Sequence, residues 1–161
     1  MNGNLDRRRF LQVTALSGAA ALAGCGTSDA LGDRQPVKLG YVSPQSGPLF
    51  AFGQADAFVI EDARRAFKDG LRIGGRAHPV EILVRDSQSS AARAGEVAHD
   101  LITRDQVTLM LASSTPETTN PVADACEQTG TPCISTVTPY QPWYLGRHPA
   151  PDPRDPKPYQ W

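Results

Sequence analysis

The hydrophobic positions after residue 36 form short β-rich runs that alternate with longer stretches of helical spacing. The strand-like runs are Val37–Val42, Val80–Arg85, Val107–Leu111 and Cys133–Ser135. Apolar residues recur every three or four positions in Ala51–Phe67 and Ala94–Ile102, and a third helix is expected from Asn120-Pro121 to Gly130. This order predicts an α/β fold, a doubly wound parallel sheet covered by helices on both faces. Gly74-Gly75 predicts a turn before the second strand.

Hydroxyl groups are concentrated where the predicted strands end. Three of the four strands lead into segments rich in Ser and Thr, most densely Ser113–Thr119 and Thr136–Thr138. Ligands of a parallel sheet bind beyond the carboxyl ends of its strands, and hydroxyls and N–H groups at helix starts suit a carboxylate or another small anion. Ser and Thr are also ordinary helix caps, so the pattern leaves both roles open.

Residues 1–25 have the three-part layout of an export signal. Arg7 and Arg8 precede an apolar run from Val13 to Ala23, which is too short for the roughly 20 residues that span a bilayer. The paired arginines resemble a twin-arginine signal, and Leu22-Ala23-Gly24-Cys25 resembles the lipobox of bacterial lipoproteins. We therefore expect lipidation at Cys25, followed by a flexible polar tether over residues 26–36. The alternative is a basic amphipathic helix that packs on the domain.

The other two cysteines form an even pair once Cys25 is set aside. In a chain destined for an oxidising compartment, such a pair predicts a disulfide between Cys126 and Cys133. Two buried thiols are the alternative. Metal binding is not favoured, because no histidine lies near either cysteine in the sequence.

Composition and motifs argue against an enzyme or a nucleic-acid-binding protein. The 161 residues carry a formal net charge of −1, which gives no basic footprint for nucleic acid. His78, His99 and His148 have neither metal-ligand spacing nor a nucleophile elbow nearby, and Asp86 alone at a strand end does not make a mechanism. The sequence also lacks a phosphate-binding or dinucleotide-binding glycine motif. We therefore expect no catalysis and no cofactor.

Three segments carry a resemblance to a known family: "VKLGYVSPQSGPLFAFG", "VEILVRDSQSSAARAGEVAHDLI" and "LMLASSTPETTNPVADACEQTGTPCIST". Over Val37 to Trp143 they resemble the first lobe of type I periplasmic solute-binding proteins, in particular the branched-chain amino-acid class that feeds ABC transporters. That family folds as two α/β lobes joined by a hinge and closes on a ligand between them. The resemblance implies an N-terminal lobe over residues 37–145 and the start of a hinge or second lobe in the Pro-rich tail, 146–161. We therefore expect an N-terminal fragment, whose single lobe binds with an affinity on the order of 1 mM.

The resemblance also implies a ligand site at the carboxyl edge of the sheet. In this family the loop after the third strand and the segment after the fourth meet the ligand, and Phe52 takes a position where an aromatic wall is common. The implied ligand-binding residues are Ser46, Phe52, Ser113, Ser114, Thr115, Glu117, Thr118, Ser135, Thr136, Thr138 and Trp143. Tyr140 and Tyr144 either line the pocket or pack the hinge.

The function implied by the resemblance is solute capture outside the cytoplasm. A lipid-anchored receptor in the periplasm, or on the outer face of the cytoplasmic membrane, would hand an amino acid or a related small polar solute to an ABC permease. A ligand-sensing module of the same fold and a nonfunctional truncated remnant are the alternatives. The sequence does not identify the solute.

Overall fold

The structure, a computed structural model, describes residues 35–145 and Arg154. The predicted signal peptide with Arg7, Arg8 and Cys25 lies outside these residues, as do most of the predicted tether and tail. Among the described residues, no helix is both long enough and apolar enough to cross a membrane.

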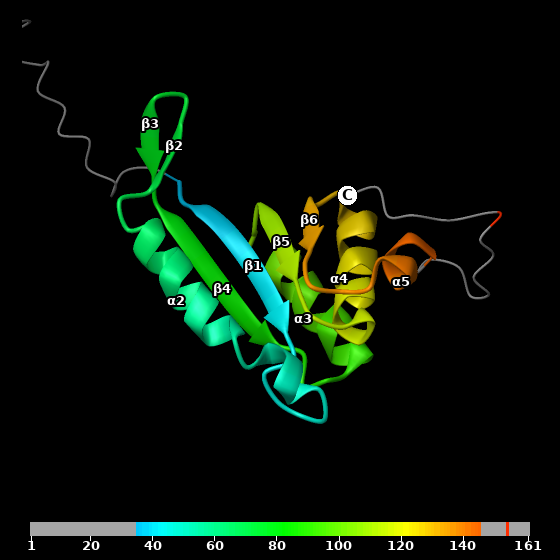
Figure 1. The fold of residues 1–161 in the computed structure, drawn as a ribbon. Helices are drawn as coiled ribbons and strands as arrows, with labels where there is room; N and C mark the ends of the chain where they lie inside the picture. Colours follow the sequence, from blue (N-terminus) through cyan, green and yellow to red (C-terminus); the bar gives the residue numbers. More distant parts are fainter. Residues whose placement is uncertain (1–34, 146–153, 155–161) are drawn as a thin grey trace, which may run out of the picture. The chain divides into compact units, whose positions relative to one another are not determined.

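Four parallel strands form the main sheet, in the order β4-β1-β5-β6 (Figure 1). They are β1 (Val37–Ser43), β4 (Val80–Asp86), β5 (Leu109–Ala112) and β6 (Cys133–Ser135). β1 pairs with β4 from Val37↔Val80 to Ser43↔Asp86, and on its other side with β5 from Leu39↔Leu109 to Val42↔Ala112. The α/β parallel-sheet fold is confirmed. The strand order reverses between β1 and β5, so the crevice expected to hold a ligand lies beyond the ends of these two strands.

Helices α3 (Ala91–Thr103) and α4 (Pro116–Thr129) cover one face of the sheet. Residues from both helices and the facing strands form the buried core: Val42, Ala94, Val97, Ala98, Leu101, Val107, Met110, Ala112, Val122, Ala125 and Cys126. Gly40 permits the close packing, because a Cβ there would collide with the Met110 sulfur. We call this side the helix-covered face.

The opposite side of the sheet is less protected. Strand alternation places Leu39 and Tyr41 of β1, Leu109 and Leu111 of β5 and Ile134 of β6 on this side, because their sequence neighbours point into the α3–α4 core. The first four side chains are half-buried and Ile134 is 50% exposed. Figure 1 shows β1, β5 and β6 with no described helix in front of them. We call this side the half-covered face.

The first predicted helix divides into two elements with a different buried side. A 3-10 turn, η2 (Phe50–Gly53), precedes α2 (Asp56–Ala66), which packs mainly against β4. Phe58 and Val59, two of the apolar residues whose spacing predicted the helix, are 73% and 57% exposed, whereas Asp56 and Ile60 are buried. The predicted helix is therefore interrupted after Gly53, and the buried side of α2 does not include its largest apolar side chain, Phe58.

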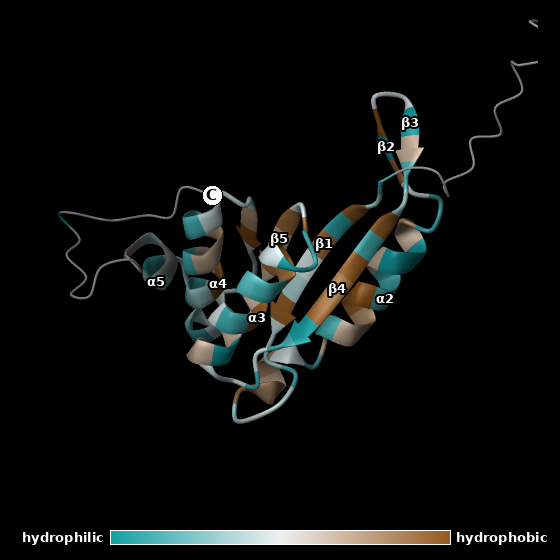
Figure 2. Cartoon of the chain, turned by 180° about the vertical axis from the view of Figure 1, so that it is seen from behind, coloured by the Kyte–Doolittle hydropathy of each residue, from teal (hydrophilic) through white to brown (hydrophobic). Residues whose placement is uncertain are grey.

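The predicted turn at Gly74-Gly75 belongs to a hairpin that the sequence pattern missed. β2 (Leu71–Ile73) and β3 (Arg76–His78) pair antiparallel around it. Both glycines have positive φ, 57° and 79°, as a tight hairpin turn requires. The hydropathy colouring in Figure 2 shows β4 as mainly hydrophobic and hydrophilic at its carboxyl end, which is the edge where the candidate site lies.

The third predicted helix begins earlier than expected. α4 starts at Pro116 rather than at Asn120-Pro121, with Thr115 as its N-cap and Pro121 inside the helix. Thr115-Pro116 is the same cap-then-proline signal as Asn120-Pro121, and proline at the first helical position loses no helix hydrogen bond. The predicted Ser/Thr loop therefore shortens to Ser113–Thr115, and Glu117, Thr118 and Thr119 belong to the first turn of α4. A short helix, α5 (Tyr140–Leu145), was not predicted.

Candidate functional site

The loops after β1 and β4 are held together by one carboxylate. Asp86 accepts hydrogen bonds from the backbone N–H groups of Gln45, Ser46 and Gln88 and from the Ser46 hydroxyl, at 2.6 to 3.2 Å. Partial burial alone raises the pKa of Asp86, but these four donors stabilise the carboxylate and hold the pKa below its usual value. The predicted ligand role of Ser46 stays a prediction, and its hydroxyl already donates to Asp86.

Gly47 completes this junction between the two loops. Its φ of +83° lies in the region that glycine favours, and a Cβ there would sit 2.8 Å from the Gln88 carbonyl oxygen. The Ser89 hydroxyl crosses the same junction, donating to the Ser46 carbonyl oxygen and accepting from the Leu49 N–H. Asp86, Ser46, Gly47 and Ser89 therefore act as a clasp that fixes the start of the η2 segment. We call these four residues the loop clasp.

The loop after β5 brings three predicted site residues together with Phe52. The Ser113 hydroxyl lies 2.8 Å from the Tyr41 hydroxyl, and the Ser114 hydroxyl donates to the Phe52 carbonyl oxygen at 3.0 Å. Phe52 itself is 59% exposed. Ser113, Ser114 and Thr115 are buried, so this loop presents a closely packed polar edge beside an exposed aromatic ring.

Thr115 begins α4 without capping it. Its carbonyl oxygen accepts from the N–H groups of Thr118 and Thr119, but its side chain makes no cap hydrogen bond and its Oγ1 is buried without a partner. The partial positive charge of the helix start therefore has no side-chain acceptor at this residue. Glu117 is exposed in the same turn, whereas Thr118 is buried and faces the Ser87 hydroxyl at 3.4 Å. Thr118 is thus turned toward the interior rather than toward solvent.

The segment after β6 forms the adjacent part of the edge. A hollow of about 390 Å³ is lined by Cys133, Ile134, Ser135, Thr138 and Tyr140. The Ser135 Oγ and Thr138 Oγ1 atoms are buried without a hydrogen-bond partner, while Thr136 is exposed. Val137 between them has a φ of +52°, an uncommon value for a β-branched residue. Tyr140 stacks on Tyr144, and the side chain of Trp143 lies outside the described part of the structure.

Two polar residues near this edge were not singled out by the sequence pattern. Tyr41 lies on the half-covered face of β1, and Asp56 is 7% exposed at the start of α2. Burial raises the pKa of Tyr41 to about 12, with the Ser113 hydrogen bond opposing the shift and the Asp56 carboxylate adding to it. The sequence offered two signals that could have pointed to these residues. One is a tyrosine within a β-rich run, and the other is an acidic residue on the inward side of a helix.

Cys126 and Cys133 are free thiols in the structure, so the predicted disulfide is not present. The alternative of two thiols is what the structure contains. A thiol–thiol hydrogen bond to Cys133 and burial raise the pKa of Cys126, which keeps its proton on sulfur. Cys126 is fully buried in the α3–α4 core and Cys133 is partly covered at the start of β6.

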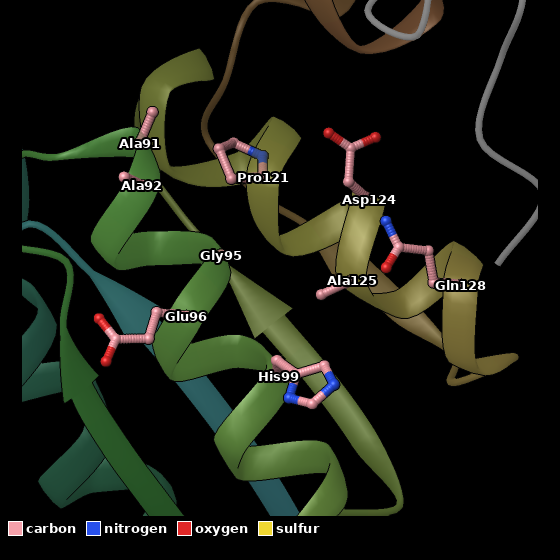
Figure 3. Close-up of a pocket in the computed structure, with 9 residues that line it drawn as sticks. All are labelled: Ala91, Ala92, Gly95, Glu96, His99, Pro121, Asp124, Ala125 and Gln128. Atoms are coloured by element: carbon pink, nitrogen blue, oxygen red, sulfur yellow. The ribbon is translucent and has the colours of Figure 1, made fainter.

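A second hollow of about 370 Å³ lies between α3 and α4 (Figure 3). Small residues line it, with polar side chains from both helices around them: Ala91, Ala92, Gly95, Glu96, His99, Pro121, Asp124, Ala125 and Gln128. None of the predicted site residues lines it. Within the described residues, no group of three or more His, Cys, Asp or Glu side chains is arranged to hold a metal ion.

The geometry defines a class of protein: an α/β lobe with polar side chains at the carboxyl edge of its parallel sheet. The sequence profile of the periplasmic binding protein family matches residues 36–159, and the chain belongs to this family. Membership implies a location outside the cytoplasm. No curated protein matches the chain.

Solved structures of the same fold are substrate-binding proteins. The branched-chain amino acid transporter substrate-binding protein LivJ from Streptococcus pneumoniae, in complex with isoleucine, is 27% identical with a TM-score of 0.54, over 65% of this chain and 29% of that one. An ABC transporter substrate-binding protein from Sphaerobacter thermophilus is 27% identical with a TM-score of 0.57, over 68% and 29%. A solute-binding protein from Rhodopseudomonas palustris, in complex with 4-hydroxybenzoate, shares the fold. It is 22% identical with a TM-score of 0.56, over 67% of this chain and 28% of that one. The chain spans less than a third of the length of these proteins.

Proposed function

We propose that this chain supplies one lobe of an extracytoplasmic solute-binding protein that delivers an amino acid or a related small polar solute to an ABC permease. One observation carries the proposal: three hydroxyl oxygens, Thr115 Oγ1, Ser135 Oγ and Thr138 Oγ1, are buried without partners at the adjoining ends of β5 and β6. A buried polar group without a hydrogen-bond partner lowers the stability of the folded protein. Such groups are therefore uncommon unless a ligand or a water molecule supplies the missing hydrogen bond.

The charges at this edge favour a ligand that carries both a negative and a positive group. The start of α4, which Thr115 leaves uncapped, suits a carboxylate. The exposed Glu117 carboxylate in the same turn suits an ammonium group and would repel a ligand that has only negative charge. LivJ, at 27% identity, is described with isoleucine, which has both groups. An α-amino acid is therefore the first ligand to test.

Calorimetry or NMR titration with L-isoleucine tests the proposed site. Thr115→Val and Ser135→Ala should each weaken binding about 10-fold, because each removes one hydrogen bond to a charged group. Thr108→Val is the matched control, since Thr108 lies at the amino end of β5 and its hydroxyl donates to the Lys38 carbonyl oxygen. Equal effects of Thr108→Val and Thr115→Val would contradict the assignment of the site.

Membrane attachment through Cys25 is a separate part of the proposal. The lipobox-like Leu22-Ala23-Gly24-Cys25 and the Arg7-Arg8 pair support an exported lipoprotein. Cys25→Ser should leave an unprocessed or released protein, while Cys133→Ser should not alter processing. Unchanged mass and membrane fractionation of Cys25→Ser would contradict the lipid anchor.

A further inference from the structure

The hairpin of β2 and β3 projects from the lobe with apolar side chains in water. Figure 1 shows it extending beyond the amino ends of β1 and β4. Leu71 and Ile73 of β2 are 39% and 48% exposed. The strand register places Leu71 opposite His78 and Ile73 opposite Arg76, so these four side chains share one face of the hairpin. Because Leu71 and Ile73 stay largely in water, their apolar surface contributes little to folding.

The same hairpin carries unpaired positive charge. Lys68, Arg72 and Arg76 are exposed. Asp69 is the only acidic residue between positions 68 and 78, so this segment has a net charge of +2 with His78 neutral, against −1 for the whole chain. None of the salt bridges formed within the described residues includes Arg72 or Arg76, whereas the arginines of α2 pair with acids of their own helix. The positive charge of the hairpin is therefore available to a partner.

The hairpin also lies where the predicted tether reaches the lobe. The Val37 N–H donates to the Pro79 carbonyl oxygen at 2.8 Å, and His78 Nδ1 lies 3.4 Å from the Gln35 carbonyl oxygen. The base of the hairpin thus contacts the end of the predicted tether, residues 26–36. Eleven residues span at most about 40 Å, so an anchor at Cys25 would keep the hairpin within that distance of the bilayer.

We propose that the β2–β3 hairpin is a membrane-contact site for a surface of anionic phospholipids. The arginines suit the phosphate groups, and Ile73, next to a tip of two glycines, suits the boundary with the acyl chains. The inference rests on the lipid anchor of the proposed function, because the anchor holds a weakly binding hairpin close to its target. Contact at this end leaves the candidate ligand edge, at the carboxyl ends of the strands, open to solution.

Tryptophan quenching tests the contact in the full chain, reconstituted into vesicles of phosphatidylglycerol and phosphatidylcholine with brominated acyl chains. Bromine quenches a tryptophan that reaches the acyl chains. Ile73→Trp should be quenched at low salt and much less at about 1 M salt, where the Debye length is about 3 Å. Phe58→Trp, an exposed position at the start of α2, is the control and should stay unquenched. The native tryptophans contribute equally to both variants.

The two arginines are tested in the Ile73→Trp protein. Arg72→Gln and Arg76→Gln should each lower the ratio of membrane-contacting to free hairpins about 5-fold. Arg93→Gln removes the same charge from the exposed arginine near the start of α3, at the carboxyl edge, and should leave the ratio unchanged.

Three results would overturn the inference while the proposed function stands. They are an unquenched Ile73→Trp in a chain that stays on the vesicles, equal quenching in vesicles of phosphatidylcholine alone, and an effect of Arg93→Gln as large as that of Arg76→Gln. If the chain does not stay with the vesicles, the lipid anchor of the proposed function fails and the inference fails with it.

Discussion

The two faces of the sheet differ in how completely the described residues cover them. On the helix-covered face, Val42, Leu101 and Met110 are fully buried between the sheet and the helices α3 and α4. On the half-covered face, Leu39 and Leu111 are only partly buried and Ile134 is 50% exposed. Stability is therefore concentrated on one side. Tyr41 lies on the other side, and its hydroxyl hydrogen-bonds with Ser113 at the carboxyl edge of the sheet.

The largest expected effect is the loss of a core side chain on the helix-covered face. Leu101→Ala should lower the free energy of unfolding by about 2–5 kcal/mol, because it removes buried apolar surface and leaves a cavity. Ile134→Ala on the half-covered face is the matched control and should cost less than about 1 kcal/mol. Urea unfolding measures both variants. Equal losses would show that the two faces contribute alike.

A loss of intermediate size is expected in the loop clasp. Gly47→Ala should destabilise the protein by about 1–2 kcal/mol, because the new Cβ meets the Gln88 carbonyl oxygen and the positive φ is unfavourable for alanine. Gly75→Ala is the control, since it also has positive φ but meets no atom within 4 Å. A difference between the two in thermal unfolding isolates the contact from the backbone strain.

Asp86 in the loop clasp should make stability depend on acid pH. Its pKa is held below the usual 3.8, so its contribution is present above that pH and is lost as the pH falls through the lowered value. Asp86→Asn should therefore be less stable at neutral pH and lose less stability on acidification. Parallel pH-dependence of the two proteins in urea unfolding would contradict this role of the carboxylate.

Tyr41 should give the opposite dependence at alkaline pH. Its pKa is about 12 in the folded protein against 10.0 for a free tyrosine, so its contribution is complete below pH 10 and disappears as the pH rises toward 12. Absorbance near 295 nm should show one phenol that titrates late and is absent in Tyr41→Phe. Titration of all four tyrosines as one normal group would refute the buried environment of Tyr41.

The smallest expected effect lies in the turn after β6. Val137 is 84% exposed and has a φ of +52°, so its side chain packs little while its backbone is strained. Val137→Asn should stabilise the protein by about 0.5–1 kcal/mol, because asparagine tolerates this conformation. Val137→Ile keeps the strain and serves as the control in the same unfolding experiment.

The fold was predictable where the local sequence settles the structure. The runs at Val37, Val80 and Cys133 became strands because β-branched residues and flanking Gly and Pro act over a few positions. The start of α4 was misplaced because Thr115-Pro116 and Asn120-Pro121 give the same local signal, and packing selects the first. The buried side of α2 could not be predicted from hydrophobicity alone, because Phe58 is exposed whereas Ile60 is buried.

The candidate site was predictable only as a region. The hydroxyl-rich segments at Ser113 and Ser135 follow parallel strands, so their meeting at one edge follows from the topology. The partners of the individual hydroxyls do not, because Tyr41 and Ser113 are 72 residues apart in sequence and meet only through the pairing of β1 with β5. The burial of Thr118 and the engagement of Ser46 by Asp86 likewise depend on contacts between distant loops.

The central claim is that a ligand binds at the joined ends of β5 and β6 and not in the hollow between α3 and α4. Titration of isotope-labelled protein with L-isoleucine, to about 10 mM to allow for weak binding, tests this most directly. The account predicts that amide signals of Ser113, Thr115, Ser135 and Thr138 shift with one common dissociation constant, while those of Gly95 and His99 stay in place. Shifts confined to Gly95 and His99, or no shifts at the strand ends, would contradict it.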